Sequence, residues 1–372
     1  MKVYINILLS LSLLALRVHC SAPAKQLSAA SAAASSSWPG ERSSLKDVPQ
    51  GAQRYLDGLS TIGKPTTQHP DEVSRLITNF ILGVGGHPLD VKGRDGIEST
   101  VHRCVSENKP IVRILTAFPI ASHKLKGQFS LGEWLALRTH QHVSKEIKSI
   151  YSPGSKLVIS REPYIYQDDK NGFNAIVQKE LGKPLYCPEQ IQRYEAALST
   201  CVEPLKPHVE LGPDLSQVYR QHYADMQVNA CDPQKLVHVG AFMEGELKAL
   251  RDSLAPEDRK AFTKKKIEAC AKSLAMAADA GAQRKSKMVK EHTPGFSDTV
   301  YLTLYGNRDD LSGGKVLTPM IKGCEGTPWH SALVVKHDGV KLVHSKDVLK
   351  ESDVQQRTCS INGLDLPYLQ KN

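Results

Sequence analysis

The chain has 372 residues, 40% of them hydrophobic, which excludes a peptide too small to bury a core and allows one large domain or two modest ones. Its 48 Lys and Arg against 39 Asp and Glu give a formal net charge of +9, which favours an anionic small molecule, an acidic surface or nucleic acid without selecting one. Basic clusters at 264–266 and 284–287 lie in alanine-rich sequence without interleaved aromatic residues, as on a solvated helix face. We therefore predict no nucleic-acid partner.

The amino terminus has the pattern of a secretory signal peptide. Lys2 precedes an apolar run at 3–16, and small residues follow around Cys20. The alternative is a membrane anchor, but the run is short for spanning a bilayer and Arg17 interrupts it. We predict that residues 1–20 are removed, that the protein is secreted, and that it has no membrane contact afterwards.

The globular region is expected to begin near Val48, because residues 21–47 are rich in Ala and Ser and read as a disordered leader. Apolar residues at helical spacing predict a helix over 71–82, and the glycine cluster at 83–86 is expected to end it.

A strand, a helix and a second strand follow at 110–160. The branched run at 110–115 predicts a buried strand, which Pro119 ends. A helix over 131–150 is predicted by one apolar stripe, formed by Leu131, Trp134, Leu135, Val143, Ile147 and Ile150. Residues 151–154 end this helix and 156–160 form the next strand. Such βαβ units bind ligands at the carboxyl ends of their strands, here near 116–126 and 160–166.

Helical patterns dominate 187–290, which we predict to be an insertion packed on the sheet. Further strands are expected at 300–305 and in a hairpin of 331–335 with 340–343, joined by His337-Asp338-Gly339. We predict an α/β fold with a Rossmann-like sheet in which 113–115, 156–159, 301–304 and 332–335 are neighbours.

Seven cysteines remain once the signal peptide is removed, so up to three disulfides are possible in an oxidising compartment. Cys187 and Cys201 are the first pair to test, although both fit packed helices equally well. No metal site is predicted, because the chain has no Cys-x-x-Cys, His-Glu-x-x-His or acidic calcium loop.

Four motifs, at 115–122, 131–137, 150–160 and 327–330, resemble the pyoverdine/dityrosine biosynthesis family of isocyanide synthases in order and separation. The resemblance extends over about 76–348 and implies one domain at 48–372. It also implies conversion of the amino group of Tyr or Trp to an isonitrile, with a pentulose phosphate as carbon donor and no metal or organic cofactor. Such a site must hold a phosphate and a carboxylate and must move protons.

His330 is the first candidate catalytic residue. It ends the Thr-Pro-Trp-His motif, matches the family's histidine, and carries a side chain suited to proton transfer near neutral pH. Trp329 would wall the pocket or stack on a ring. Alternatively, Trp329 belongs to the core and His330 is a hydrogen-bonded residue at the end of a strand.

Lys124 and Lys126 are the candidate phosphate ligands, since they follow the loop at Pro119. The family has lysine where this chain has Ala121, so the phosphate contact has either shifted along the loop or been lost. Both lysines also fit an ordinary protein surface.

Three further residues complete the candidate set. Glu133 matches a family glutamate and is assigned to substrate binding, but a carboxylate in a first helical turn is also favourable with the helix dipole. Tyr305 is a candidate catalytic residue where the family usually has histidine, and tyrosine is a poor base. Arg161 is expected to meet an anion or to form an exposed ion pair. We predict that His330, Trp329, Lys124 and Tyr305 line one pocket.

Two functions remain open. The first is a divergent isocyanide synthase-like enzyme acting on an amino acid and a sugar phosphate. The second is a secreted, non-catalytic binding or effector protein that keeps the fold. The signal peptide and the altered lysine position both indicate a changed function. A hydrolase has little support, because the chain has no Gly-x-Ser-x-Gly motif.

Overall fold

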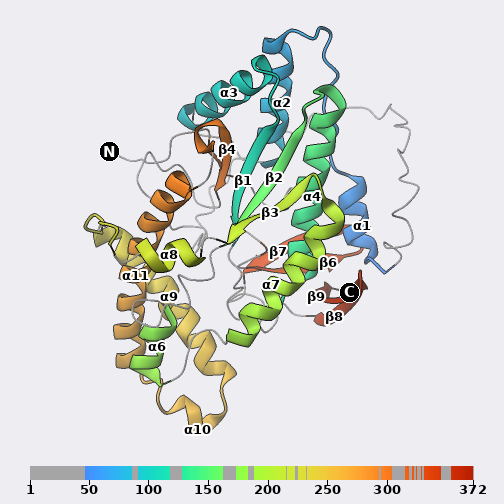
Figure 1. The fold of residues 1–372 in the computed structure, drawn as a ribbon. Helices are drawn as coiled ribbons and strands as arrows, with labels where there is room; N and C mark the ends of the chain where they lie inside the picture. The colour runs from blue at the N-terminus through green and yellow to red at the C-terminus, as the bar shows by residue number, and fades with distance from the viewer. Residues whose placement is uncertain are drawn as a thin grey trace, which may run out of the picture.

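The computed structural model describes most of the chain from Asp47 onwards. The described residues are 47–85, 91–117, 128–161, 173–182, 188–214, 216–222, 225–231, 233–292, 295–303, 315–317, 321, 324, 328, 331–344 and 353–371. Within them the chain forms two β-sheets, helices that pack on both sheets, and a separate helical body (Figure 1).

The first sheet, sheet A, is parallel throughout. Its strands are β1 (Ile111–Ala117), β2 (Ser155–Arg161), β3 (Val209–Asp214), β4 (Thr299–Thr303) and β5 (Lys315–Leu317). They are ordered β3-β2-β1-β4-β5. Strand β1 is therefore the central strand, with β2 and β3 on one side of it and β4 and β5 on the other. Parallel strands need crossover connections, and α4 (Leu131–Ile150) supplies the one between β1 and β2. The predicted α/β class and the predicted βαβ unit are confirmed.

Helices bury one face of sheet A. The main core joins apolar residues of this sheet to α1 (Gln50–Asp57), α2 (Pro70–Gly85), α3 (Val91–Ser106), α4 and α7 (Pro188–Val202). The bounds of α4 agree with the sequence prediction. Helix α2 instead runs through Gly83 and ends at Gly85, three residues beyond the expected end.

The second sheet, sheet B, contains β6 (Ser331–Lys336), β7 (Gly339–His344), β8 (Val354–Ile361) and β9 (Leu364–Lys371), in the order β7-β6-β9-β8. The predicted hairpin of β6 with β7 is confirmed. The prediction that 332–335 lies beside the strands of sheet A is wrong. Strand β6 pairs with β7 along one edge and with β9 along the other, which leaves no edge for sheet A.

A helical body with its own core lies beside the sheets, at the lower left of Figure 1. It comprises α6 (Phe173–Leu181), α8 (Ser216–His222), α9 (Pro233–Ser253), α10 (Pro256–Arg259) and α11 (Lys264–His292). The segment predicted as a helical insertion, 187–290, therefore also contains α7, which packs in the main core, and the edge strand β3. Short turns η3 (Glu203–Leu205) and η4 (Phe296–Asp298) lead into β3 and β4.

A buried arginine ties α4 to sheet A. Arg113 on β1 is 1% exposed and donates to Ser155 Oγ at 3.0 Å, to the His140 carbonyl at 3.0 Å, and to Ser144 Oγ at 2.5 Å. Its Nη1 also lies 3.4 Å from His140 Nδ1. These partners are all uncharged, and burial lowers the pKa of Arg113 to about 9. The same burial, together with the Arg113 charge, lowers the pKa of His140 to about 3. The neutral imidazole accepts at Nδ1.

This network predicts a specific dependence of stability on pH. The pKa of His140 is about 3 in the folded protein against its ordinary value of 6.5, so between these two pH values the unfolded chain binds a proton that the folded protein does not. The contribution of neutral His140 to the free energy of unfolding is complete above pH 6.5 and declines as the pH falls towards 3. The expected slope approaches about 1.4 kcal/mol per pH unit. His140→Asn keeps an acceptor near the position of Nδ1 and should remove this slope.

The measurement is urea denaturation of both proteins between pH 4.5 and 7. The pKa of Glu72 is lowered to about 2 by bonds from the Thr66 and Thr67 backbone and hydroxyl groups, so its own contribution declines only below its ordinary value of 4.5. This contribution is the same in both proteins and cancels when their slopes are compared. Equal slopes for the two proteins would contradict the assignment.

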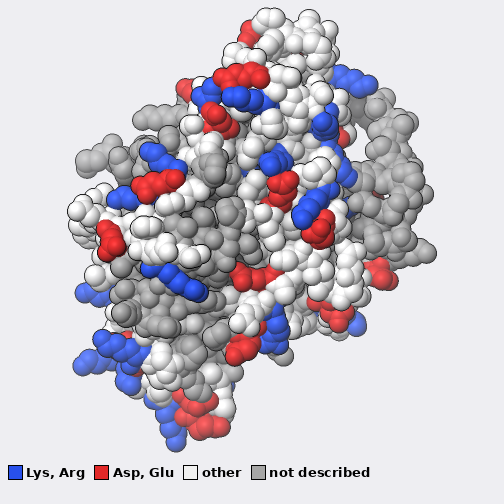
Figure 2. Space-filling view, viewed as in Figure 1, with Lys and Arg blue, Asp and Glu red and all other residues white. Residues whose placement is uncertain are grey.

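Figure 2 shows acidic and basic side chains interspersed over the described part of one face. In this view the excess of positive charge is not gathered into one broad field over the described residues.

Candidate functional site

The register of sheet A brings four strand ends to one edge. Ala117 at the end of β1 lies opposite Arg161 of β2, which in turn lies opposite Asp214 of β3. Strand β4 ends at Thr303, one residue beyond the paired Leu115 and Leu302. In Figure 1 these carboxyl ends point towards the middle of the molecule, between the helical body and sheet B. Open parallel sheets bind ligands at this edge.

The amino terminus of α4 follows the loop that leaves this edge. Ser130 caps the helix: its hydroxyl accepts from Gly132 N at 3.2 Å, and its backbone N–H donates to Glu133 Oε2 at 3.0 Å. A further hydrogen bond joins the Ser130 hydroxyl to the same carboxylate oxygen. This reciprocal capping box fixes the first turn of α4. Its signature, Ser-x-x-Glu before an apolar run, is visible in the sequence.

Glu133 lies wholly inside the protein, with 0% of its surface exposed. Besides Ser130 it contacts α7, where the Tyr194 hydroxyl donates to Oε1 at 3.3 Å. Burial and the neighbouring carboxylate raise the pKa of Tyr194 well above its ordinary value of 10, so the phenol keeps its proton and remains a donor. Glu133 thus links α4 to α7, and its assigned part in substrate binding stays a prediction.

Gly132 lies close to Pro328 and to Leu333 of β6. A Cβ atom built on Gly132 would lie 3.2 Å from the Cβ of Pro328 and 3.4 Å from the Cβ of Leu333. Pro328 is buried and Leu333 is 0% exposed. Gly132 and Pro328, which belong to motifs far apart in the sequence, therefore lie close together at the start of α4.

Most predicted site residues lie outside the described residues. These are His330, Trp329, Tyr305, Lys124 and Lys126, so the prediction of a shared pocket stays a prediction. The backbone of Arg161 ends β2 at the ligand edge, while its side chain is outside the description. Glu133 alone of the set is described in full.

Ser160 is a residue that the sequence analysis missed. It lies next to Arg161 at the end of β2, is 5% exposed, and its Oγ has no hydrogen-bond partner within the described structure. A buried hydroxyl without a partner costs free energy, and such groups are frequently explained by a ligand or water. No sequence signal singles out this serine.

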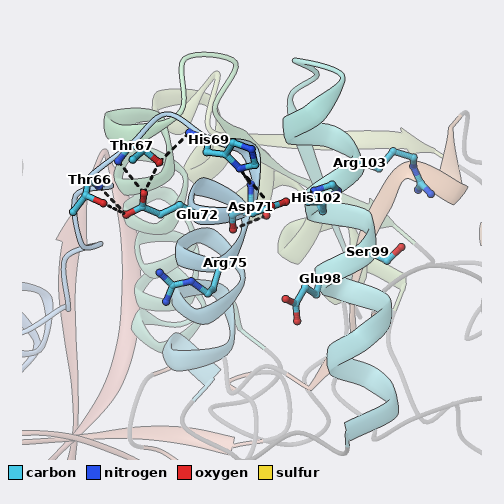
Figure 3. A pocket seen from close by; sticks show the side chains of 11 residues that line it. Thr66, Thr67, His69, Asp71, Glu72, Arg75, Glu98, Ser99, His102 and Arg103 are labelled. Atoms are coloured by element: carbon cyan, nitrogen blue, oxygen red, sulfur yellow. Dashed lines mark hydrogen bonds and ion pairs between the residues drawn. The ribbon is translucent and has the colours of Figure 1, made fainter.

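A separate cavity of about 930 Å3 lies between the start of α2 and the end of α3 (Figure 3). Glu72 in its wall accepts bonds from Thr66 and Thr67, while Asp71 lies 2.8 Å from His102 Nε2 and 3.4 Å from His69 Nδ1. Because α3 leads directly into the start of β1, this cavity lies towards the amino edge of sheet A. Its position and its internally bonded carboxylates make it a poor candidate for the site.

Five of the described cysteines are buried free thiols, namely Cys104, Cys201, Cys270, Cys324 and Cys359. Cys201 is one of these free thiols and lies on a packed helix, which is the alternative that the sequence left open for it. Cys201 packs in the main core on the inner side of α7, where burial raises its pKa to about 12. Cys187 lies outside the described residues.

Within the described ranges, no three His, Cys, Asp or Glu side chains are grouped so as to hold a metal ion. None of the helices in the described part of the chain combines the length and apolar character needed to cross a membrane.

The parallel sheet, its helical cover and the ligand edge define an open α/β protein. Residues 101–170, which include β1, α4 and β2, match the sequence model of the family described as pyoverdine/dityrosine biosynthesis protein. The chain is 26% identical over 285 residues to the isocyanide synthase xanB of Aspergillus fumigatus. The aligned region covers 67% of this chain. Both findings support a similarity of this chain to the pyoverdine/dityrosine biosynthesis family.

A solved structure shares this fold. The crystal structure of the PvcA protein from Pseudomonas aeruginosa superposes with a TM-score of 0.55 and 16% sequence identity, covering 80% of this chain and 100% of that one. The chain spans only 35% of the length of the xanB protein.

Proposed function

We propose that this protein is an isocyanide synthase that converts the amino group of Tyr or Trp to an isonitrile, with a pentulose phosphate as carbon donor. The observation that carries the proposal is the family match over residues 101–170, because this segment builds the ligand edge of sheet A and the capped start of α4. The similarity to xanB supports the same class of reaction.

The proposed roles follow from what the reaction needs. The amine must condense with the sugar ketone, forming a C=N bond and releasing water, so protons must move at both atoms. His330 is the proposed proton carrier, assisted by Tyr305. Lys124, Lys126 and Arg161 are the proposed anion ligands, Trp329 is the proposed wall of the pocket, and Glu133 fixes the first turn of α4. The Ser160 hydroxyl, whose position the structure does describe, is available to accept or donate a bond to a polar substrate group.

The experiment is incubation of the purified mature protein with Tyr or Trp and ribulose 5-phosphate, followed by mass spectrometry for the isonitrile. The expected product appears only when both substrates and the folded protein are present. Omission of the sugar phosphate and heat denaturation of the protein are the controls. Absence of product with every aromatic amino acid would contradict the proposal.

The second candidate is a secreted binding or effector protein that retains the fold. It is favoured by the apolar run at 3–16 and by alanine at position 121, where the family has lysine. Binding of Trp or of ribulose 5-phosphate, measured by calorimetry, without any turnover would support this function. Under either function we propose secretion with removal of residues 1–20, which amino-terminal sequencing of the secreted protein tests.

A further inference from the structure

Two contacts fix how α2 lies against α3. Near one end, Asp71 of α2 lies 2.8 Å from Nε2 of His102 on α3. About two turns further along α2, Asn79 accepts a hydrogen bond from Arg94 of α3 at 2.9 Å. The residue number rises from 71 to 79 on one helix while it falls from 102 to 94 on the other, so the two helices run antiparallel.

Midway between these contacts, Arg75 of α2 and Glu98 of α3 occupy facing positions. Each is four residues from the contact before it and four from the contact after it on its own helix. Residues four apart share one face of a helix, so a guanidinium and a carboxylate lie across from each other. Among the described residues, however, Arg75 has no ion pair or hydrogen bond to its side chain, and Glu98 lies 4.0 Å from Arg94 on its own helix.

The cavity of about 930 Å3 lies where this middle contact would be. Arg75 and Glu98 both line it, and in Figure 3 both side chains lie below the contact of Asp71 with His102. Its volume is within the range of small-molecule sites, about 300–1,000 Å3. The residues described as its lining are all polar or charged, which suits a small polar molecule rather than an acyl chain or an aromatic ring.

Hydrogen bonds within the protein hold the walls of this cavity. Glu72 accepts bonds from the backbone N–H and the hydroxyl groups of Thr66 and Thr67, at 2.7 to 2.8 Å. These bonds, the one from the Thr66 backbone foremost, lower the pKa of Glu72 to about 2. Asp71 is likewise engaged by His102. Both carboxylates are therefore committed to the protein, which leaves the facing guanidinium and carboxylate to meet a ligand.

We propose that this cavity binds a small zwitterion, a polar amino compound whose carboxylate meets Arg75 and whose ammonium group meets Glu98. A guanidinium binds a carboxylate through two parallel N–H donors, and a carboxylate accepts strong bonds from an ammonium group. One molecule that carries both charges satisfies both sides. A simple anion would be repelled by Glu98, and a simple cation by Arg75.

This site is separate from the ligand edge of sheet A. Helix α3 leads directly into the start of β1, so the cavity lies towards the opposite, amino edge of that sheet. Its polar lining gives no apolar surface for the ring of Tyr or Trp. The inference therefore goes beyond the proposed function and does not rest on it.

The experiment titrates the purified protein with L-serine and follows the ring resonance of His102 by NMR, with His102→Asn to assign it. His102 lies one turn along α3 from Glu98, so this resonance reports on the cavity itself. We expect one saturable shift with a dissociation constant of about 1 mM, because contacts that are partly exposed to water are weak. N-acetyl-L-serine lacks the ammonium group and L-serinamide lacks the carboxylate, so each should bind about tenfold more weakly.

Variants of the two facing residues test the assignment. Arg75→Gln and Glu98→Gln should each weaken serine binding about tenfold. The matched control is Arg54→Gln, since Arg54 is an exposed helical arginine of α1 outside the cavity, and it should leave binding unchanged. The double variant Arg75→Glu with Glu98→Arg should recover most of the binding, because a zwitterion can enter in the opposite orientation.

A His102 resonance that stays unchanged up to about 20 mM serine would overturn the inference. So would equal binding of N-acetyl-L-serine, full binding by either single variant, or a double variant that binds no better than the single ones. An amino acid bound only at the ligand edge of sheet A would also leave the His102 resonance unchanged. Isonitrile formation is measured separately, so failure of this inference and failure of the proposed function are distinguishable.

Discussion

Replacing Gly51 by alanine is expected to destabilise the protein by about 2–3 kcal/mol, near the upper part of the range for overpacked cores. Gly51 lies on α1 against the hairpin of β6 and β7, where an added Cβ would stand 2.0 Å from the Lys336 carbonyl oxygen and 2.5 Å from that of Gly339. Both obstacles are backbone atoms of a paired hairpin, so they cannot rotate away. The gain in helix propensity, at most about 1 kcal/mol, is too small to compensate.

Urea denaturation followed by circular dichroism measures this loss. Gly240→Ala is the matched control: it adds the same methyl group inside a helix where nothing lies within 4 Å. It should leave stability unchanged or raise it by up to about 1 kcal/mol. If Gly51→Ala proved as stable as the unmutated protein, α1 could not pack on the β6–β7 hairpin as described.

Replacing His330 by alanine is expected to lower the rate of isonitrile formation by roughly 10²–10⁴-fold, the usual contribution of a general acid or base. The reason is that an imidazole both accepts and donates protons near neutral pH, whereas alanine does neither. Substrate affinity should change little, since the proposed anion ligands are other residues. Single-turnover rates and calorimetric binding of Trp give the two quantities separately.

His337→Ala is the control for this variant, because His337 is an exposed residue in the turn between β6 and β7. It should keep the full rate. A His330→Ala protein that folds normally and also keeps the full rate would remove His330 from the proposed mechanism.

The parts of the fold that follow local patterns were predictable from the sequence. Strands β1, β2 and β4 are runs of branched residues, and α4 carries a continuous apolar stripe, so both their type and their position were expected. The turn between β6 and β7 was expected from its Asp-Gly pair. In these elements the local preference and the tertiary structure agree.

The elements that depend on distant partners were not predictable. Strand β3 contains Gly212 and Pro213, which argue against a strand, but proline is tolerated in the edge strand of a sheet. Strand β6 is buried along most of its length, so its sequence does not reveal which sheet it joins. The β8–β9 hairpin could have been found from Asn362 and Gly363, both at positive φ in its turn.

The candidate site was predictable only as a set of residue types. Family motifs pointed to Glu133 and to the segment that ends at His330, but not to the contact between Gly132 and Pro328, because that contact joins distant parts of the chain. In the sequence, Arg113 interrupts the apolar run at 110–115. Its burial becomes acceptable only through His140, Ser144 and Ser155, which come from later segments.

The contact of α1 with β6 and β7 also bears on how the protein folds. Helix α1 comes from the start of the described chain and the hairpin from near its end, yet both close the main core around α4. Contacts between residues so distant in sequence slow folding, because a long loop must be ordered before they are gained. A fragment that ended after β4 would contain most of sheet A. It would lack the strands of sheet B, against which α1 packs and which α4 also contacts. Sheet A and sheet B therefore form one cooperative unit, in which neither sheet is expected to fold without the other.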